Sequence, residues 1–192
     1  MPRADPLETL QDSLKGAPII WKGDYPYFIH PISDGIPRME AEVLRATRDL
    51  IVDMVDWSDV DLIVSVEAMG LPLLAAVGEA TGKPTVVIRK RTYGMGGEVR
   101  VDVSTGYSCS TAYINDIKPG ERIVVVDDVI STGGTLEPIL EALEEMGAIL
   151  KGVVIAIEKG EGRERLAKER PNWPIQTLAR IDIVEGRVEI IE

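Results

Sequence analysis

Two adjacent acids stand in the middle of the chain, directly after a run of β-branched residues. Residues 123–126 read Ile-Val-Val-Val without alternation, which is typical of a strand buried on both faces of a parallel sheet. The sequence predicts that Asp127 and Asp128 end this strand. Carboxylates at that edge of an α/β sheet can accept hydrogen bonds from vicinal sugar hydroxyls or face a metal ion, so both acids are candidate catalytic and metal-facing residues.

The residues after the acids have the composition of an anion-binding loop. They are Ser131, Thr132, Gly133, Gly134 and Thr135, and a helix is expected to follow. Glycines let the backbone turn its N–H groups toward an anion, hydroxyls add donors, and the positive end of the helix dipole favours a phosphate monoester. Because the loop has no lysine, it differs from the nucleoside triphosphate loop Gly-x-x-x-x-Gly-Lys-Ser/Thr. Helix capping alone would need neither the paired acids nor the paired glycines.

Alternating strand and helix patterns predict an α/β fold, with a central parallel sheet flanked by helices, that positions these residues. The predicted strands cover 62–66, 85–88, 123–126 and 153–157, and the helices cover 7–14, 43–55, 73–80 and 136–143. Residues 181–191 alternate around Glu185-Gly186 and predict a C-terminal hairpin. In segment 92–111, glycines interrupt an alternating stretch, which predicts a flexible two-stranded β flap.

Two further segments follow predicted strands at the same edge of the sheet. Glu67, Ala68, Met69 and Gly70 come after strand 62–66 and open a helix, so their N–H groups could bind a second anion. A plain strand-to-helix turn is the alternative. The cluster of Arg89, Lys90 and Arg91 follows strand 85–88. Such a cluster is either a solvated sheet edge or a set of cations that neutralises a highly charged leaving group.

Residues 123–135 closely resemble the phosphoribosyl pyrophosphate signature of type I phosphoribosyltransferases. Segments 27–35, 67–70, 89–91 and 157–162 resemble the archaeal hypoxanthine phosphoribosyltransferase subfamily, which is similar to adenine phosphoribosyltransferases. The resemblance covers nearly the whole chain. It implies a single phosphoribosyltransferase domain over 1–192, with a flap at about 92–111 and a small hood formed by about 19–36 and 159–192.

The resemblance also implies roles for the candidate residues. Residues 131–135 would bind the 5′-phosphate, and Asp127 and Asp128 would hold the ribose and face Mg²⁺, mainly through the substrate. Residues 67–70 and 89–91 would bind pyrophosphate, and Lys90 would also be catalytic. The base-binding candidates are Ile29, His30, Glu158 and Lys159.

Two of the base-binding candidates have structural alternatives. His30 is the only histidine of the chain, and a histidine of this kind can simply be a satisfied structural residue. Lys159 follows a predicted buried strand, where an ammonium could donate to the 6-oxo group of a purine. It could equally be an exposed loop lysine.

These residues predict a purine-salvage pentosyltransferase that converts hypoxanthine, and guanine as a second substrate, to IMP and GMP with release of pyrophosphate. An adenine phosphoribosyltransferase and a non-catalytic regulator that senses phosphoribosyl pyrophosphate are the alternatives. Adenine-specific relatives commonly have arginine at the position of Met69. They also commonly have glutamate at the position of Gly106, if Tyr107 is the flap tyrosine. Both departures disfavour adenine.

Composition agrees with a small cytoplasmic enzyme. The chain has 192 residues, 45% of them hydrophobic, which is enough for one domain with a real core. A net charge of −11 disfavours nucleic acid as a partner, and no apolar stretch approaches the ~20 residues of a membrane span. The lone Cys109 suits a reducing compartment. The resemblance adds an expected homodimer.

Overall fold

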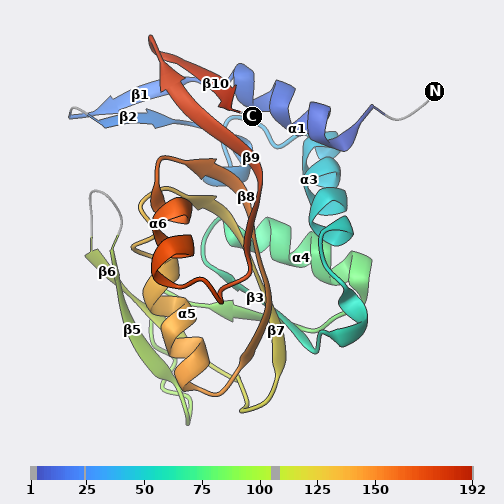
Figure 1. The fold of residues 1–192 in the computed structure, drawn as a ribbon, viewed down its shortest axis with the longest axis vertical. Coiled ribbons are helices and arrows are strands. Elements are labelled where there is room, and N and C mark those ends of the chain that lie inside the picture. The colour runs from blue at the N-terminus through green and yellow to red at the C-terminus, as the bar shows by residue number, and fades with distance from the viewer. Residues whose placement is uncertain (1–3, 24, 105–108, 192) are drawn as a thin grey trace.

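A six-stranded sheet with the order β10-β9-β8-β7-β3-β4 lies at the centre of the molecule (Figure 1). The structure, a computed structural model, describes residues 4–23, 25–104 and 109–191. The sheet strands are β3 (Leu62–Val66), β4 (Thr85–Ile88), β7 (Arg122–Ile130), β8 (Ile149–Lys159), β9 (Ile175–Val184) and β10 (Arg187–Ile191). All neighbouring strands pair in parallel except β10, which pairs antiparallel with β9. The predicted central parallel sheet and C-terminal hairpin are confirmed.

Helices cover both faces of this sheet (Figure 1). One face carries α1 (Pro6–Lys15), α3 (Ala41–Asp53) and α4 (Gly70–Thr81), and the other carries α5 (Leu136–Glu145) and α6 (Gly162–Glu169). Successive residues of β7 serve the two faces in turn. Ile123 and Val125 pack with α5, whereas Val124 and Val126 pack with α1, α3 and α4. This double burial explains why the strand is a continuous apolar run.

Two small antiparallel hairpins complete the described fold. The first is the flap hairpin, β5 (Val99–Ser104) with β6 (Cys109–Ile114), which packs Val101, Val103, Ala112 and Ile114 into the core on the α5 side. It confirms the predicted pair of strands and extends beyond residue 111. Gly106 and Tyr107 lie outside the described residues. The second is the hood hairpin, β1 (Ile19–Lys22) with β2 (Tyr25–Phe28), followed by the short α2 (Pro31–Asp34). The 3₁₀ helix η1 (Trp57–Asp59) precedes β3.

The structure corrects where two strands end. The prediction that Asp127 and Asp128 end a strand is wrong, because β7 continues to Ile130 and pairs with β8 as far as Glu158. Val129 and Ile130 prolong the apolar run, and Ile130 is buried on the α5 side. Strand β8 also runs further than predicted, because it pairs with β7 as far as Glu158 and with β9 as far as Lys159. Both residues therefore end the strand rather than start a loop. None of the helices in the described ranges combines the length and apolar character needed to cross a bilayer.

Candidate active site

A cavity of about 310 Å³, called here the central cavity, opens at the carboxyl ends of β3 and β7. From β3 the chain continues to β4 on one side, while β7, β8 and β9 extend the sheet on the other. Ligands of open α/β sheets bind at such a reversal of strand order. The lining combines residues 67–69, 127–136, Lys90, Lys159 and parts of both hairpins. The fold therefore brings together the segments that the sequence marked separately.

Asp127 and Asp128 lie side by side at the base of this cavity. Burial raises the pKa of Asp127 to about 6. Burial, and then the neighbouring Asp127 carboxylate, raise the pKa of Asp128 well above its ordinary value. Oδ1 of Asp127 and the hydroxyl of Ser65 are both buried beside Gly70, and neither has a hydrogen-bond partner among the described residues. The pair thus favours a ligand that brings positive charge or hydroxyl donors.

The 131–135 loop follows directly and faces the same cavity. Gly133 has φ +83°, a conformation that L side chains rarely adopt. Gly134 meets the flap hairpin, since its carbonyl accepts from Ser104 N–H at 3.0 Å and a Cβ there would lie 2.6 Å from the Ser104 carbonyl oxygen. Within the described part of the chain, no side chain caps the start of helix α5 at Leu136, which leaves N–H groups for an anion.

Helix α6 supports this loop from behind, a feature that the sequence patterns did not predict. Gly162 N–H donates to the Ser131 carbonyl at 2.8 Å. Arg165 Nη2 donates to the Thr132 carbonyl at 3.2 Å and contacts Glu137 of α5 at 2.7 Å. A Cβ on Gly162 would lie 2.3 Å from the Ser131 carbonyl oxygen. The loop backbone is therefore held in place before any ligand binds.

The two predicted pyrophosphate segments meet through Glu67. Its carboxylate accepts from Lys90 N–H and lies 3.2 Å from Arg89 Nη2, so it orients the basic segment rather than an anion. The side chain of Lys90 lines the central cavity, as do Ala68 and Met69. Arg89 and Arg91 are not among the lining residues, and Arg91 donates to the Tyr93 hydroxyl at 2.9 Å.

Gly70 lies beneath the 67–69 turn. A Cβ there would be 1.9 Å from Ser65 Oγ and 2.8 Å from Asp127 Oδ1, so only glycine lets α4 start this close to the acid pair. Of the predicted pyrophosphate residues, the structure brings Glu67, Ala68, Met69 and Lys90 to the cavity.

The structure does not bring Ile29 and His30 to the central cavity. Both line a separate hollow between α1 and the start of α3. His30 Nδ1 accepts from Ile32 N–H at 3.2 Å, so Nε2 must carry the ring proton and donate to Ser13 Oγ at 3.1 Å. Burial lowers the pKa of His30 to about 4, which keeps the ring neutral. Both ring nitrogens of His30 are thus hydrogen-bonded, as expected of a structural histidine, and Ile29 lies with it in the separate hollow.

Glu158 and Lys159 point in opposite directions, as neighbours on a strand do. Glu158 is 1% exposed and accepts from Arg163 Nε at 2.6 Å and from Thr177 Oγ1 at 2.8 Å, so it faces α6 and β9 instead of the central cavity. Lys159 lines the cavity, and its ammonium donates to the Pro26 carbonyl of the hood hairpin at 2.7 Å. The lysine is buried rather than exposed. Of these two base-binding candidates, the structure brings Lys159 to the central cavity and Glu158 to α6 and β9.

Comparisons with known proteins point to one family. Residues 34–177 match the family model described as "Phosphoribosyl transferase domain". The chain is 49% identical to a hypoxanthine/guanine phosphoribosyltransferase of Methanocaldococcus infernus, over 94% of this chain and 98% of that protein. It is 48% identical to the protein of the same name from Ferroglobus placidus, over 97% of this chain and 98% of that one.

Solved structures show the same fold at lower identity. Adenine phosphoribosyltransferase from Thermoanaerobacter pseudethanolicus superposes with a TM-score of 0.75 at 21% identity, over 91% of this chain and 99% of that one. The enzyme from Trypanosoma brucei, in complex with AMP, pyrophosphate and ribose-5-phosphate, also gives 0.75 at 21% identity, over 94% and 81%. Since the family model covers most of the chain and close relatives align along nearly their whole length, this chain belongs to the phosphoribosyltransferase family.

Proposed function

We propose that the protein is a purine-salvage enzyme that joins hypoxanthine, and guanine as a second substrate, to phosphoribosyl pyrophosphate, giving IMP or GMP and pyrophosphate. The structural observation that carries this choice of base is Lys159, a buried ammonium at the cavity rim formed by β8. The named function of the relatives at 48–49% identity supports it. The adenine-specific structures are only about 21% identical and bear on the fold.

The cavity accounts for each part of the cosubstrate. The 131–135 loop and the start of α5 hold the 5′-phosphate, and Asp127 and Asp128 accept hydrogen bonds from the ribose hydroxyls. The 67–70 turn supplies N–H groups to the pyrophosphate, and Lys90 neutralises the charge that develops as it leaves. Positive charge grows on the ribose carbon while the base approaches, so catalysis consists of alignment and charge stabilisation without a covalent nucleophile.

Mg²⁺ fits this site as a partner of the substrate. Oδ1 of Asp127 lacks a partner among the described residues, and burial raises the pKa of both acids. A nearby cation would stabilise their charged forms. Within the described ranges no three His, Cys, Asp or Glu side chains gather as a metal site. Asp127 and Asp128 would therefore face the ion together with substrate oxygens, as is usual for Mg²⁺. When bound, the ion neutralises part of the pyrophosphate charge.

Lys159 distinguishes the purines by the group they carry at position 6. A 6-oxo group accepts a hydrogen bond from the ammonium, whereas the 6-amino group of adenine is itself a donor and cannot accept one. An ammonium has three donors. One of them is used by the Pro26 carbonyl, so a base can take another while the hood hairpin stays attached.

Replacing Lys159 with alanine should lower kcat/KM for hypoxanthine tenfold or more, because a charged hydrogen bond is worth about 1.5–3 kcal/mol. The rate with adenine, if measurable, should not fall. Lys168→Ala, an exposed lysine on α6, is the matched control and should behave as wild type. Steady-state kinetics with both bases separates two causes. An equal loss for both bases would mean that Lys159 only holds the hood hairpin, and an unchanged hypoxanthine rate would refute its role in base choice.

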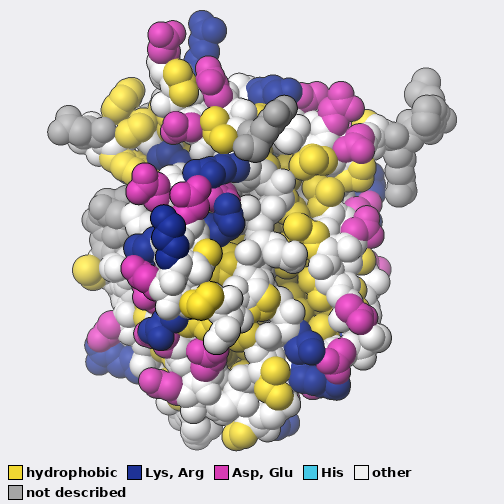
Figure 2. Space-filling view, in the orientation of Figure 1, with side chains coloured by type: hydrophobic (Ala, Val, Ile, Leu, Met, Phe, Trp, Pro, Cys, Tyr) yellow, Lys and Arg dark blue, Asp and Glu magenta, His cyan; other side chains and the backbone are white. Residues whose placement is uncertain are grey.

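The regulator alternative gains no support from the face of the molecule that Figure 2 shows. On the face shown in Figure 2, Lys and Arg side chains are interspersed with Asp and Glu and do not form a basic patch. We treat the whole chain as one catalytic unit, with the flap hairpin and the hood hairpin bordering the cavity. The homodimer, the cytoplasmic location and the flexibility of the flap remain predictions.

A further inference from the structure

The hood hairpin reaches the 131–135 loop through one side chain. The hydroxyl of Tyr25 in β2 lies 3.2 Å from Ser131 Oγ, although the two residues are far apart in the sequence. Tyr25 and Ser131 both line the central cavity. None of the sequence motifs includes Tyr25.

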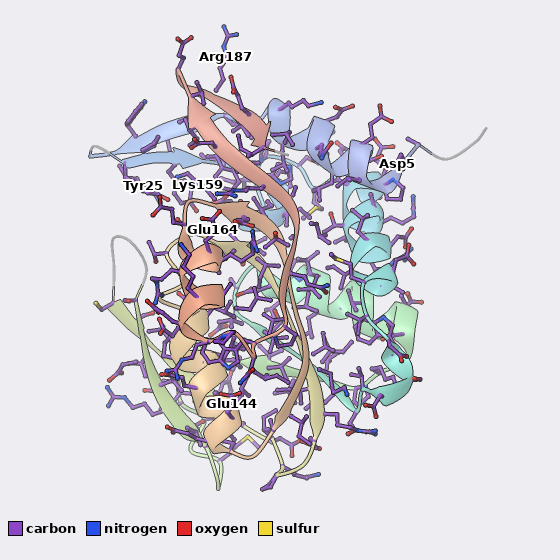
Figure 3. All side chains as sticks on the ribbon, viewed as in Figure 1. Asp5, Tyr25, Glu144, Lys159, Glu164 and Arg187 are labelled. Atoms are coloured by element: carbon purple, nitrogen blue, oxygen red, sulfur yellow. The ribbon has the colours of Figure 1, made fainter. Side chains whose placement is uncertain are left out.

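Lys159 holds Tyr25 in this position. Its ammonium lies 3.9 Å from the centre of the Tyr25 ring and donates to the carbonyl of the next residue, Pro26. Figure 3 shows Tyr25 and Lys159 close together beneath the hood hairpin. Burial alone would raise the pKa of Tyr25, but the contacts with Lys159 and Ser131 lower it below its ordinary value. The phenol is therefore a fixed group and a good hydrogen-bond donor.

A phosphate in the 131–135 loop changes what these hydroxyls must do. Phosphate oxygens only accept, so every hydroxyl at the site has to donate to them. Tyr25 and Ser131 are within reach of the same point, because their hydroxyls are within hydrogen-bond distance of each other. A bound phosphate can accept from both, which replaces one neutral hydrogen bond with two charge-assisted ones.

We propose that Tyr25 of the hood hairpin is a further residue that binds the 5′-phosphate. A pentose phosphate monoester bound in the loop would then hold the hood hairpin against the loop. Because Lys159 contacts Tyr25, the same ligand would also position Lys159 for the base. This inference rests on the proposed function for the identity of the cosubstrate, but the phosphate contact itself does not depend on the base.

Calorimetric titration of ribose 5-phosphate tests the contact without turnover. Tyr25→Phe should weaken binding about tenfold, the value of one charge-assisted hydrogen bond. The same loss should persist when Ser131→Ala is the starting protein, because Tyr25 contacts the phosphate itself. Tyr27→Phe is the matched control. Tyr27 lies on the same strand and also lines the central cavity, but its hydroxyl donates to Asp34 at 2.6 Å, so ribose 5-phosphate affinity should stay within about twofold of wild type.

Three results would overturn the proposal. Tyr25→Phe could bind as tightly as wild type. Its effect could vanish in the Ser131→Ala background, so that Tyr25 merely orients the serine. Tyr27→Phe could weaken binding equally, which would assign the loss to a loosened hood hairpin. A protein that binds ribose 5-phosphate through Tyr25 but does not convert hypoxanthine would refute the proposed function alone.

Discussion

Replacing Gly134 with valine should lower the affinity for phosphoribosyl pyrophosphate at least about a hundredfold, since the loop can no longer close on the phosphate. A side chain at this position would also clash with the flap hairpin. A Cβ on Gly134 would lie 2.6 Å from the carbonyl oxygen of Ser104 and 2.7 Å from its hydroxyl, so any side chain pushes the loop away from the flap hairpin. The hydrogen bond from Ser104 N–H to Gly134 would break as well.

Calorimetry with phosphoribosyl pyrophosphate and Mg²⁺ measures this loss. Gly16→Val is the matched control, because Gly16 ends α1 with φ −92° and a Cβ there meets nothing within 4 Å. The control should bind as wild type does. Full affinity in a folded Gly134→Val protein would show that the 131–135 loop does not hold the phosphate.

Asp128→Asn should lower kcat/KM by about a hundredfold or more while making the ligand-free protein more stable at neutral pH. Two adjacent buried carboxyls with raised pKa values destabilise the fold when both are charged. Removing one charge should therefore raise the free energy of unfolding at neutral pH. A residue retained for packing would instead lose stability when it is changed.

The pH dependence has a definite sign. Because the folded-state pKa of each acid lies above its unfolded value of about 3.9, the folded protein binds more protons in the interval between them. The acids therefore cost stability as the pH rises through the folded pKa, which is about 6 for Asp127. His30 acts in the opposite direction. Its pKa in the folded protein, about 4, lies below its unfolded value, so the folded protein loses stability as the pH falls below that unfolded value.

Denaturant unfolding at several pH values between 5 and 8 compares wild type with Asp128→Asn. The His30 contribution is common to both proteins, so their difference isolates the acids. We expect the stability gain of the variant to grow with pH. If the variant has a lower free energy of unfolding than wild type while its folded fraction keeps normal turnover, Asp128 is structural.

The sequence predicted the parts of the fold that depend on local patterns. Strands 62–66 and 85–88 appear with those bounds because apolar runs end at polar or charged residues there. The end of β7 was mispredicted because acidic residues are uncommon inside strands and usually mark the point where a strand ends. In this chain Asp127 and Asp128 stay in the strand, since Val129 and Ile130 continue it and β8 pairs alongside.

The candidate site was predictable where one segment carries its own chemistry. The 131–135 loop and the 67–70 turn are examples. Tyr25, Arg165 and Ser65 depend on contacts between segments far apart in the chain, which spacing does not reveal. The aromatic composition of β2, Tyr-Pro-Tyr-Phe, could have indicated that the hood hairpin faces the site. Glu158 shows the limit of that reasoning, because the facing direction of Lys159 and Glu158 requires the register with β9.

A competition between bases tests the central claim most directly. Wild-type protein would receive phosphoribosyl pyrophosphate, Mg²⁺ and equal concentrations of hypoxanthine, guanine, adenine and xanthine, and the nucleotides formed would be quantified together with pyrophosphate. We predict IMP as the main product with GMP second, each at least about tenfold above AMP, in amounts that match the pyrophosphate released. A predominance of AMP, or binding of phosphoribosyl pyrophosphate without formation of any nucleotide, would contradict this account.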